Sequence, residues 1–192
     1  PADRNARERT SGYGRVGPVL QAVDGAAMKV KLNPEEAMMA VAVGARRECK
    51  NIYSKFKDLS PPKNGKRDGW SNMITGACAE CAVAKALGLY WSGVLNSARD
   101  SFTCPDIGID LEARCANSGN LYIKQRDIDS RRLIYVIGEL PEFELIGWVN
   151  IVEVKQGPFD EYGYSKIRSS QMRPLSTLNE LLQTVDAADL TG

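Results

Sequence analysis

The segment that decides the fold is residues 104–127, which reads CPDIGIDLEARC, then a short loop, then LYIKQRD. In its first half, Asp110, Glu112 and Arg114 alternate with apolar residues. Because successive side chains of a strand point to opposite faces, these three polar side chains share one face of a predicted strand. The strand is expected to begin near Asp106, and Gly108 allows a bend or bulge at its start.

The acids of this segment are candidate metal ligands. Two acids and a cation crowded at a strand end are costly unless they bind water, metal or substrate. Asp106 and Glu112 supply carboxylates, and Arg114 or Lys124 supplies the cation. Glu80, from a helix packed beside the sheet, adds a third carboxylate. The pattern therefore predicts a site for a divalent metal ion.

The composition excludes several kinds of catalysis. The chain has 192 residues, a formal net charge of +1 and no histidine. Without histidine there is no Ser-His-Asp triad, no Cys-His nucleophile and no H-E-x-x-H zinc site. There is also no apolar run of membrane-spanning length and no signal-peptide pattern, so we expect a soluble cytoplasmic protein with no membrane partner.

The cysteines allow two interpretations. The chain contains five, an odd number that indicates reduced thiols in a protein without an export signal. Cys78 and Cys81 form a C-x-x-C pair, and Cys104 with Cys115 would complete a structural zinc site. The favoured interpretation is that Cys78 and Cys81 are small buried residues of an alanine-rich helix.

Three segments differ in composition. Residues 1–27 are rich in Arg, Gly and Ala, and they are interpreted as a flexible N-terminal extension or a vector-derived addition. Residues 28–185 are expected to form a single domain, and residues 186–192 a frayed tail.

A first helix is predicted from Pro34 to about Phe56. Asn33 is an N-cap candidate, Pro34 occupies the first turn, and two acids follow. Its predicted apolar face contains Met38, Met39, Ala42 and Ala45. The later turns carry Arg46, Arg47 and Lys50, which are interpreted as a solvated basic face.

A second helix is predicted to begin near Asn72, and Gly88 is expected to end it. Its small residues indicate close packing against another element. Glu80 is an acid within a run of small apolar residues, and structural and functional roles are equally open for it.

The remaining predicted elements are mostly strands. They comprise residues 109–115, 121–124, 133–138 and 143–149. The first two are expected to form an antiparallel pair across the turn at 117–120, and the third to be buried on both faces. Residues 151–169 are expected to be loop-like and residues 176–185 to form a short helix.

An acid on a helix, then Pro-Asp, then Glu-x-basic on a strand resembles the PD-(D/E)XK nuclease superfamily. The matching residues are Glu80, Asp106, Glu112 and Arg114. Together with GWV at 147–149, the order and spacing of the motifs resemble small bacteriophage-encoded members, over roughly residues 28–178.

The resemblance implies an α/β fold with a restriction-endonuclease-like core, a mixed sheet of about four strands flanked by helices. It implies a nuclease that depends on Mg²⁺ or Mn²⁺ and hydrolyses the DNA backbone with metal-activated water, in the cytoplasm of a bacterial host. Asp106 and Glu112 would be metal ligands, and Glu80 would support the metal or its water. Arg114 stands where the family usually has Lys, so Lys124 is the alternative cation. The interval from Asp106 to Glu112 is short for the family, so Asp110 is an alternative ligand.

Basic residues outside these motifs are candidate phosphate contacts. They are Lys63, Lys66, Arg67, Arg126, Arg131 and Arg173. DNA versus RNA, endo versus exo action and a homodimer all stay open. The alternatives are a nuclease-like DNA-binding or inhibitory protein that does not cleave, a zinc protein, and an α/β interaction domain with a solvated strand face.

Overall fold

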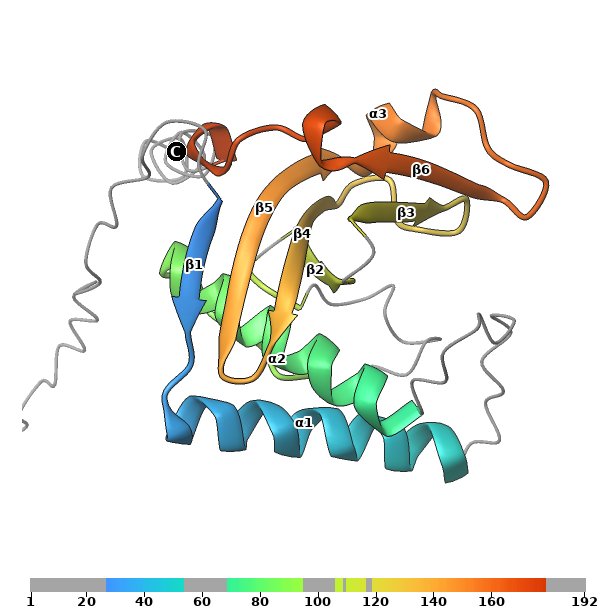
Figure 1. Ribbon diagram of the computed structural model, residues 1–192. Coiled ribbons are helices and arrows are strands. Elements are labelled where there is room, and N and C mark those ends of the chain that lie inside the picture. The colour runs from blue at the N-terminus through green and yellow to red at the C-terminus, as the bar shows by residue number, and fades with distance from the viewer. Residues whose placement is uncertain (1–26, 54–68, 95–105, 109, 117–118, 179–192) are drawn as a thin grey trace, which may run out of the picture.

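The computed structural model describes residues 27–53, 69–94, 106–108, 110–116 and 119–178. A mixed four-stranded sheet has helices on one face and a two-stranded ribbon on the other (Figure 1). The predicted α/β class and the mixed sheet flanked by helices are therefore confirmed. Lys63, Lys66, Arg67 and Cys104 lie outside the described residues.

The four-stranded sheet has the order β1-β5-β4-β2. Its strands are β1 (Met28–Lys31), β5 (Glu142–Asn150), β4 (Arg132–Glu139) and β2 (Leu111–Cys115). β2 runs parallel to β4, and the other pairs are antiparallel. A separate ribbon pairs β3 (Asn120–Lys124) with β6 (Tyr164–Arg168) in antiparallel orientation.

The predicted antiparallel pairing of residues 109–115 with 121–124 is wrong. Residues 133–136 of β4 are buried on both faces, as expected, so this strand lies inside the sheet with partners on both sides. One partner of β4 is β2, which runs parallel to it. β3 pairs with β6 rather than with β2. Residues 151–169 are not a loop, since they contain the short helix α3 (Ile151–Lys155) and β6.

The first helix, α1 (Pro34–Tyr53), begins where the sequence predicts. Asn33 Oδ1 accepts from the Glu36 amide at 2.8 Å, and Glu36 Oε2 accepts from the Asn33 amide at 2.7 Å. Partial burial would raise the pKa of Glu36, but Lys85, whose Nζ lies 2.7 Å from Oε2, and the Asn33 contact outweigh it and lower the pKa.

The predicted apolar face of α1 is wrong. Met38 and Met39 are 66% and 56% exposed, whereas the buried residues are Ala40, Gly44 and Arg47. These face α2 (Gly69–Leu87), whose residues 77–84 are all buried. A surface of Ala and Cys side chains lets α1 approach closely, which large side chains on α1 would prevent.

α2 lies between α1 and the sheet (Figure 1). It ends at Leu87, and Gly88 follows with φ +64°, which supports the predicted glycine closure. None of the described helices is long and apolar enough to cross a membrane.

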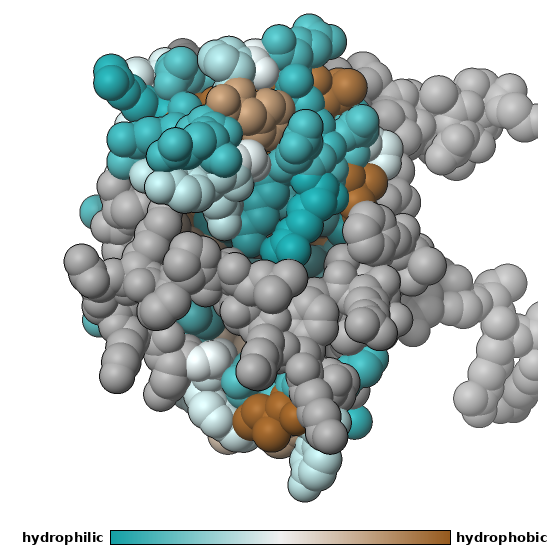
Figure 2. Space-filling view, turned by 90° about the vertical axis from the view of Figure 1, so that its right-hand side faces the viewer, coloured by the Kyte–Doolittle hydropathy of each residue, from teal (hydrophilic) through white to brown (hydrophobic). Residues whose placement is uncertain are grey.

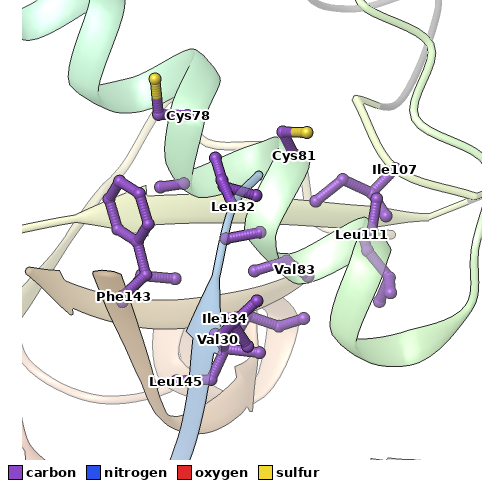
Figure 3. Packing of buried hydrophobic residues seen from close by; sticks show 14 of the residues in the cluster. Val30, Leu32, Cys78, Cys81, Val83, Ile107, Leu111, Ile134, Phe143 and Leu145 are labelled. Atoms are coloured by element: carbon purple, nitrogen blue, oxygen red, sulfur yellow. The ribbon is translucent and has the colours of Figure 1, made fainter. Parts of the chain in front are cut away.

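Two apolar clusters use opposite faces of the sheet. The larger packs α2 against the sheet and includes Val83, Ile134 and Leu145 (Figure 3). The smaller lies under the ribbon and contains Leu121, Ile123, Leu133, Tyr135, Val149 and Ile151. The strand alternation of β4 assigns Ile134 to the first cluster and its neighbours Leu133 and Tyr135 to the second.

The close approach of α1 to α2 can be tested at Gly44. A Cβ at Gly44 would lie 2.5 Å from Ile74 Cα and 2.6 Å from Met73 O, both backbone atoms of α2. We expect Gly44→Ala to destabilise the protein by about 1–3 kcal/mol, because the helix backbones must separate. Gly76→Ala is the control, since nothing lies within 4 Å of its Cβ position. It should be neutral or stabilising by up to about 1 kcal/mol. Urea unfolding of both variants measures the difference, and equal stabilities would contradict the close packing.

Candidate acid–arginine site

A buried ion pair joins the two long helices. Arg47 of α1 and Glu80 of α2 are 8% and 6% exposed. Arg47 Nη1 donates to Glu80 Oε1 at 2.6 Å and Nη2 donates to Oε2 at 2.9 Å, which is the bidentate geometry of a strong arginine–carboxylate pair. Burial would lower the pKa of Arg47, but the hydrogen bonds and charge of Glu80, with the charge of Asp106, outweigh it and raise the pKa.

The segment after α2 closes over this pair. Trp91 Nε1 donates to Glu80 Oε2 at 3.1 Å, and Arg47 Nε donates to the Val94 carbonyl at 3.0 Å. Both oxygens of Glu80 and all three guanidinium nitrogens of Arg47 therefore have partners. These hydrogen-bond partners offset the free-energy cost of removing two ions from water, which a buried ion pair must overcome.

Asp106 joins the pair from the segment before β2. Its Oδ1 lies 3.4 Å from Arg47 Nη2, the nitrogen that also donates to Glu80. The Asp106 carbonyl accepts from the amide of Ser92 at 3.1 Å, which ties this residue to the segment that covers Glu80. Glu80 and Asp106 thus share one guanidinium although they come from separate elements.

A tight turn relates Asp106 to Glu112. The Ile107 amide donates to the Leu111 carbonyl at 3.4 Å and the Leu111 amide to the Ile107 carbonyl at 3.2 Å. Asp106 and Glu112 are the next positions outward from this antiparallel bridge. This isolated bridge brings the segment that carries Asp106 back toward the start of β2, the strand that carries Glu112.

Glu112 has two arginine neighbours. It accepts from Arg131 Nη1, and Arg114 Nη2 lies 3.9 Å from its Oε2. Arg114 Nη1 also donates to Asp127 Oδ2 at 3.0 Å and to the Tyr122 carbonyl at 2.6 Å. Arg131, a predicted phosphate contact, is only 5% exposed, because its guanidinium is used inside the protein.

Asp110 has one satisfied oxygen and one that is not. Oδ2 accepts from Arg132 Nη1. Oδ1 is buried and has no hydrogen-bond partner among the described residues. Because a buried carboxylate oxygen without a partner is costly, this atom has capacity for a further donor or cation.

Among the other predicted basic residues, Lys124 and Arg173 lie near aromatic rings and Arg126 is exposed. Lys124 Nζ lies 5.7 Å from the centroid of the Tyr164 ring, and Arg126 is exposed in the turn after β3. Arg173 lies over the Trp148 ring at 4.9 Å and pairs with Glu153 at 2.7 Å. Of the two candidate catalytic cations, Arg114 is therefore the one in contact with Glu112.

Arg47, Trp91 and Asp127 belong to this site although no sequence pattern singled them out. Arg47 was assigned to a solvated face because it lies between other basic residues. A usable signal was present, since Arg47 follows Ala40 and Gly44 at helical spacing on the small-residue side of α1. An acid buried in α2 needs a cation from the neighbouring helix, and Arg47 is on the side that faces it.

The acids and arginines nearly balance in charge. Among the described residues no group of three or more Asp, Glu or Cys side chains is arranged to hold a metal ion. Instead the carboxylates of Glu80, Asp106, Asp110, Glu112 and Asp127 are each in contact with an arginine. The arrangement can fix carboxylates at one edge of the sheet and place a guanidinium beside them.

The two helix cysteines do not resemble zinc ligands. Burial, with smaller contributions from neighbouring thiols and acids, raises the pKa of Cys78 to about 12, and burial raises the pKa of Cys81 to about 11. Both thiols are therefore protonated at neutral pH, as is typical of small buried residues in an alanine-rich helix.

Comparison with known proteins gives no match: no protein-family model, no curated protein and no solved structure is significantly similar to this chain. The functional argument therefore rests on the residues and their geometry.

Removal of Arg47 should be far more costly than removal of its exposed neighbour. We expect Arg47→Met to destabilise the protein by about 3–5 kcal/mol, because Glu80 is left as a buried charge. Adding Glu80→Gln to Arg47→Met should recover part of that loss. Arg46→Met, on the exposed side of the same turn, should change stability by less than about 0.5 kcal/mol. Chemical denaturation of the parent and of these variants, with Glu80→Gln alone to complete the cycle, measures these differences, and additive effects of the two single changes would contradict a direct pair.

Thiol labelling tests the cysteine environments. At pH 8 we expect Cys49, which is exposed, to react with an alkylating reagent while Cys78 and Cys81 do not. Only a thiolate reacts readily, and both helix thiols are buried and protonated at this pH. Peptide mass spectrometry identifies the labelled residues, with urea-unfolded protein as the positive control. Rapid labelling of Cys78 in folded protein would contradict its placement.

Proposed function

We propose that the protein is a metal-dependent nuclease with a restriction-endonuclease-like core. The observation that carries the proposal is the meeting of Glu80 and Asp106 on one guanidinium nitrogen of Arg47, with Asp106 in a segment that leads through a tight turn into β2, which carries Glu112. Glu112, on the edge strand β2, lies beside Arg114, which also pairs with Asp127. Structural ion pairs alone do not require so many carboxylates in one place.

The donor chemistry fits Mg²⁺ or Mn²⁺. All candidate ligands are carboxylate oxygens, which these hard cations prefer. Asp106 and Glu112 would hold the ion, and the unpartnered Oδ1 of Asp110 makes that residue a further candidate ligand. Asp106 is suited to this because its contact with Arg47 is long, at 3.4 Å, and its side chain is 20% exposed.

Glu80 has a different role in this proposal. Both of its oxygens are bound to Arg47, and one also accepts from Trp91. It therefore acts as a positioning residue that fixes Arg47, which in turn orients Asp106. Glu80 could reach an ion directly only if Arg47 moved away.

Arg114 supplies a fixed positive charge beside Glu112. A guanidinium keeps its proton at neutral pH, so Arg114 cannot act as a general base. It can bind a non-bridging oxygen of the scissile phosphate and orient it toward the acids. A bound divalent ion supplies charge stabilisation at the phosphate and lowers the pKa of attacking water.

A second candidate is a nuclease-like protein that binds DNA or inhibits a protein without cleavage. Its support is the set of arginine contacts that occupy Glu80 and Glu112. In that case the acid–arginine pairs serve only to hold the sheet edge together.

A cleavage assay separates the two candidates. We expect degradation of single-stranded, double-stranded or branched DNA with Mg²⁺ or Mn²⁺, and none with chelator. Asp106→Asn and Glu112→Gln should each reduce the rate on the order of 100-fold or more, because a metal ligand is lost. Product length, measured on denaturing gels, reports endo or exo action.

The controls address folding. Asp106→Asn leaves the Arg47–Glu80 pair intact, so its thermal melt should match the parent protein. Glu142→Gln changes an exposed acid of β5 and should leave cleavage unchanged. Chelator-resistant cleavage, or full activity of both site variants, would contradict the metal site. DNA binding without cleavage of any substrate would favour the second candidate.

A further inference from the structure

The β3–β6 ribbon has one buried face and one outer face. Leu121 and Ile123 of β3 are fully buried beneath it, and Ser165 of β6 is buried too. The alternating residues therefore point outward. On the outer face the register places Tyr122 opposite Lys166, Lys124 opposite Tyr164, and Asn120 opposite Arg168.

This outer face combines aromatic rings with cations. The Tyr122 and Tyr164 rings lie 6.4 Å apart in an edge-to-face arrangement at 89°, and Lys124 Nζ lies 5.7 Å from the Tyr164 ring centroid. Lys166 and Arg168 are exposed. None of the outward residues of β3 or β6 is acidic, so the face carries three positive charges.

Two acids that flank the ribbon in sequence, Asp127 and Asp160, have hydrogen-bond partners. Asp127 accepts from Arg114 and from the Lys124 amide at 2.8 Å. Asp160 Oδ1 accepts from the amides of Tyr162 and Tyr164 at 3.0 and 2.8 Å. Glu161 is exposed in the turn before β6, so these acids flank the strands and none of them is an outward residue of β3 or β6.

We propose that the outer face of the β3–β6 ribbon binds single-stranded nucleic acid, with bases stacked on Tyr122 and Tyr164 and phosphates held by Lys166 and Arg168. The inference rests on the proposed nuclease function and extends it to the form of the substrate. Tyrosine rings stack on unpaired bases, whereas bases within a duplex already stack on each other. Five-residue strands make a platform about 16 Å long, which suits a short stretch of one strand.

The ribbon also leads to the acids. The Tyr122 carbonyl accepts from Arg114 Nη1 at 2.6 Å, and Arg114 Nη2 lies 3.9 Å from Glu112 Oε2. A strand bound across Tyr122 is thus one arginine side chain away from the candidate site. Hydrophilic side chains gather on the upper part of the molecule in Figure 2, at the height where Figure 1 shows the ribbon.

The test is a binding measurement in chelator, which prevents cleavage. Fluorescence anisotropy of labelled oligothymidylate reports affinity as a function of salt. We expect Tyr164→Leu to weaken binding by about 5- to 150-fold with little change in salt dependence, because stacking is lost but no phosphate contact is. The double variant Lys166→Gln/Arg168→Gln should weaken binding and reduce the slope of log K against log salt by about 1.4.

Matched controls lie outside the ribbon face. Tyr162→Leu removes a tyrosine that is 74% exposed in the loop before β6, and Lys29→Gln removes an exposed lysine of β1. Both should bind like the parent protein. Unchanged affinity for the oligonucleotide in the ribbon variants, or losses confined to duplex DNA, would overturn the inference.

The ribbon inference is tested by binding in chelator and the nuclease proposal by cleavage with metal, so the two can fail separately. Metal-dependent cleavage by a protein whose ribbon variants bind normally would overturn only the ribbon inference. Ribbon-dependent binding by a protein that never cleaves would support the ribbon inference while the nuclease proposal fails.

Discussion

The structure depends on the buried contact between Arg47 and Glu80. Two ions removed from water are stable together only when their geometry is fixed and their remaining atoms are satisfied. Here the bidentate pair, the Trp91 indole and the Val94 carbonyl provide that satisfaction. The pair therefore fixes how α1 and α2 lie together, and small residues such as Gly44 give the close approach that the pair needs.

The same contact organises the sheet edge. Asp106 reaches Arg47 from the segment before β2, so the start of that strand is tied to the helix layer. From there, Glu112 and Arg114 connect β2 to Arg131 and Asp127. Two groups of alternating charges result, one around Arg47 between the helices and one around Glu112 that reaches the ribbon through Arg114, and each acid is held in position by a cation.

Local signals in the sequence predicted the parts of the fold that depend on local chemistry. Asn33 and Pro34 begin α1, and Gly88 follows the end of α2. Two other features depend on contacts distant in sequence. Met38 and Met39 are exposed although they are apolar, because Ala40, Gly44 and Arg47 occupy the side of α1 that faces α2. The turn-like sequence at 117–120 favours a hairpin between the strands on either side of it. In the structure β2 is instead the parallel neighbour of β4, a strand that is buried on both faces.

Part of the candidate site could be predicted from the sequence, and the rest again depends on contacts between residues distant in sequence. Glu80, Asp106 and Glu112 stand out as acids among apolar residues, so the sequence alone identifies them. Their arginine partners do not stand out, because Arg47 and Arg131 lie in runs of charged residues that resemble ordinary surface. Which of several arginines is buried depends on which side of a helix or turn faces an acid, and that is fixed only by tertiary packing.

The presence of two separate apolar clusters has a consequence for how the protein opens. The apolar contacts that anchor the ribbon belong to the small cluster, in which Leu121 and Ile123 meet Leu133 and Tyr135. The helices are anchored through the larger cluster on the other face of the sheet. Detachment of the ribbon would therefore uncover one cluster and leave the other intact, which is the behaviour of a cooperative unit below global unfolding. Backbone amides of β3 and β6 would then exchange their hydrogens with solvent sooner than those of α2.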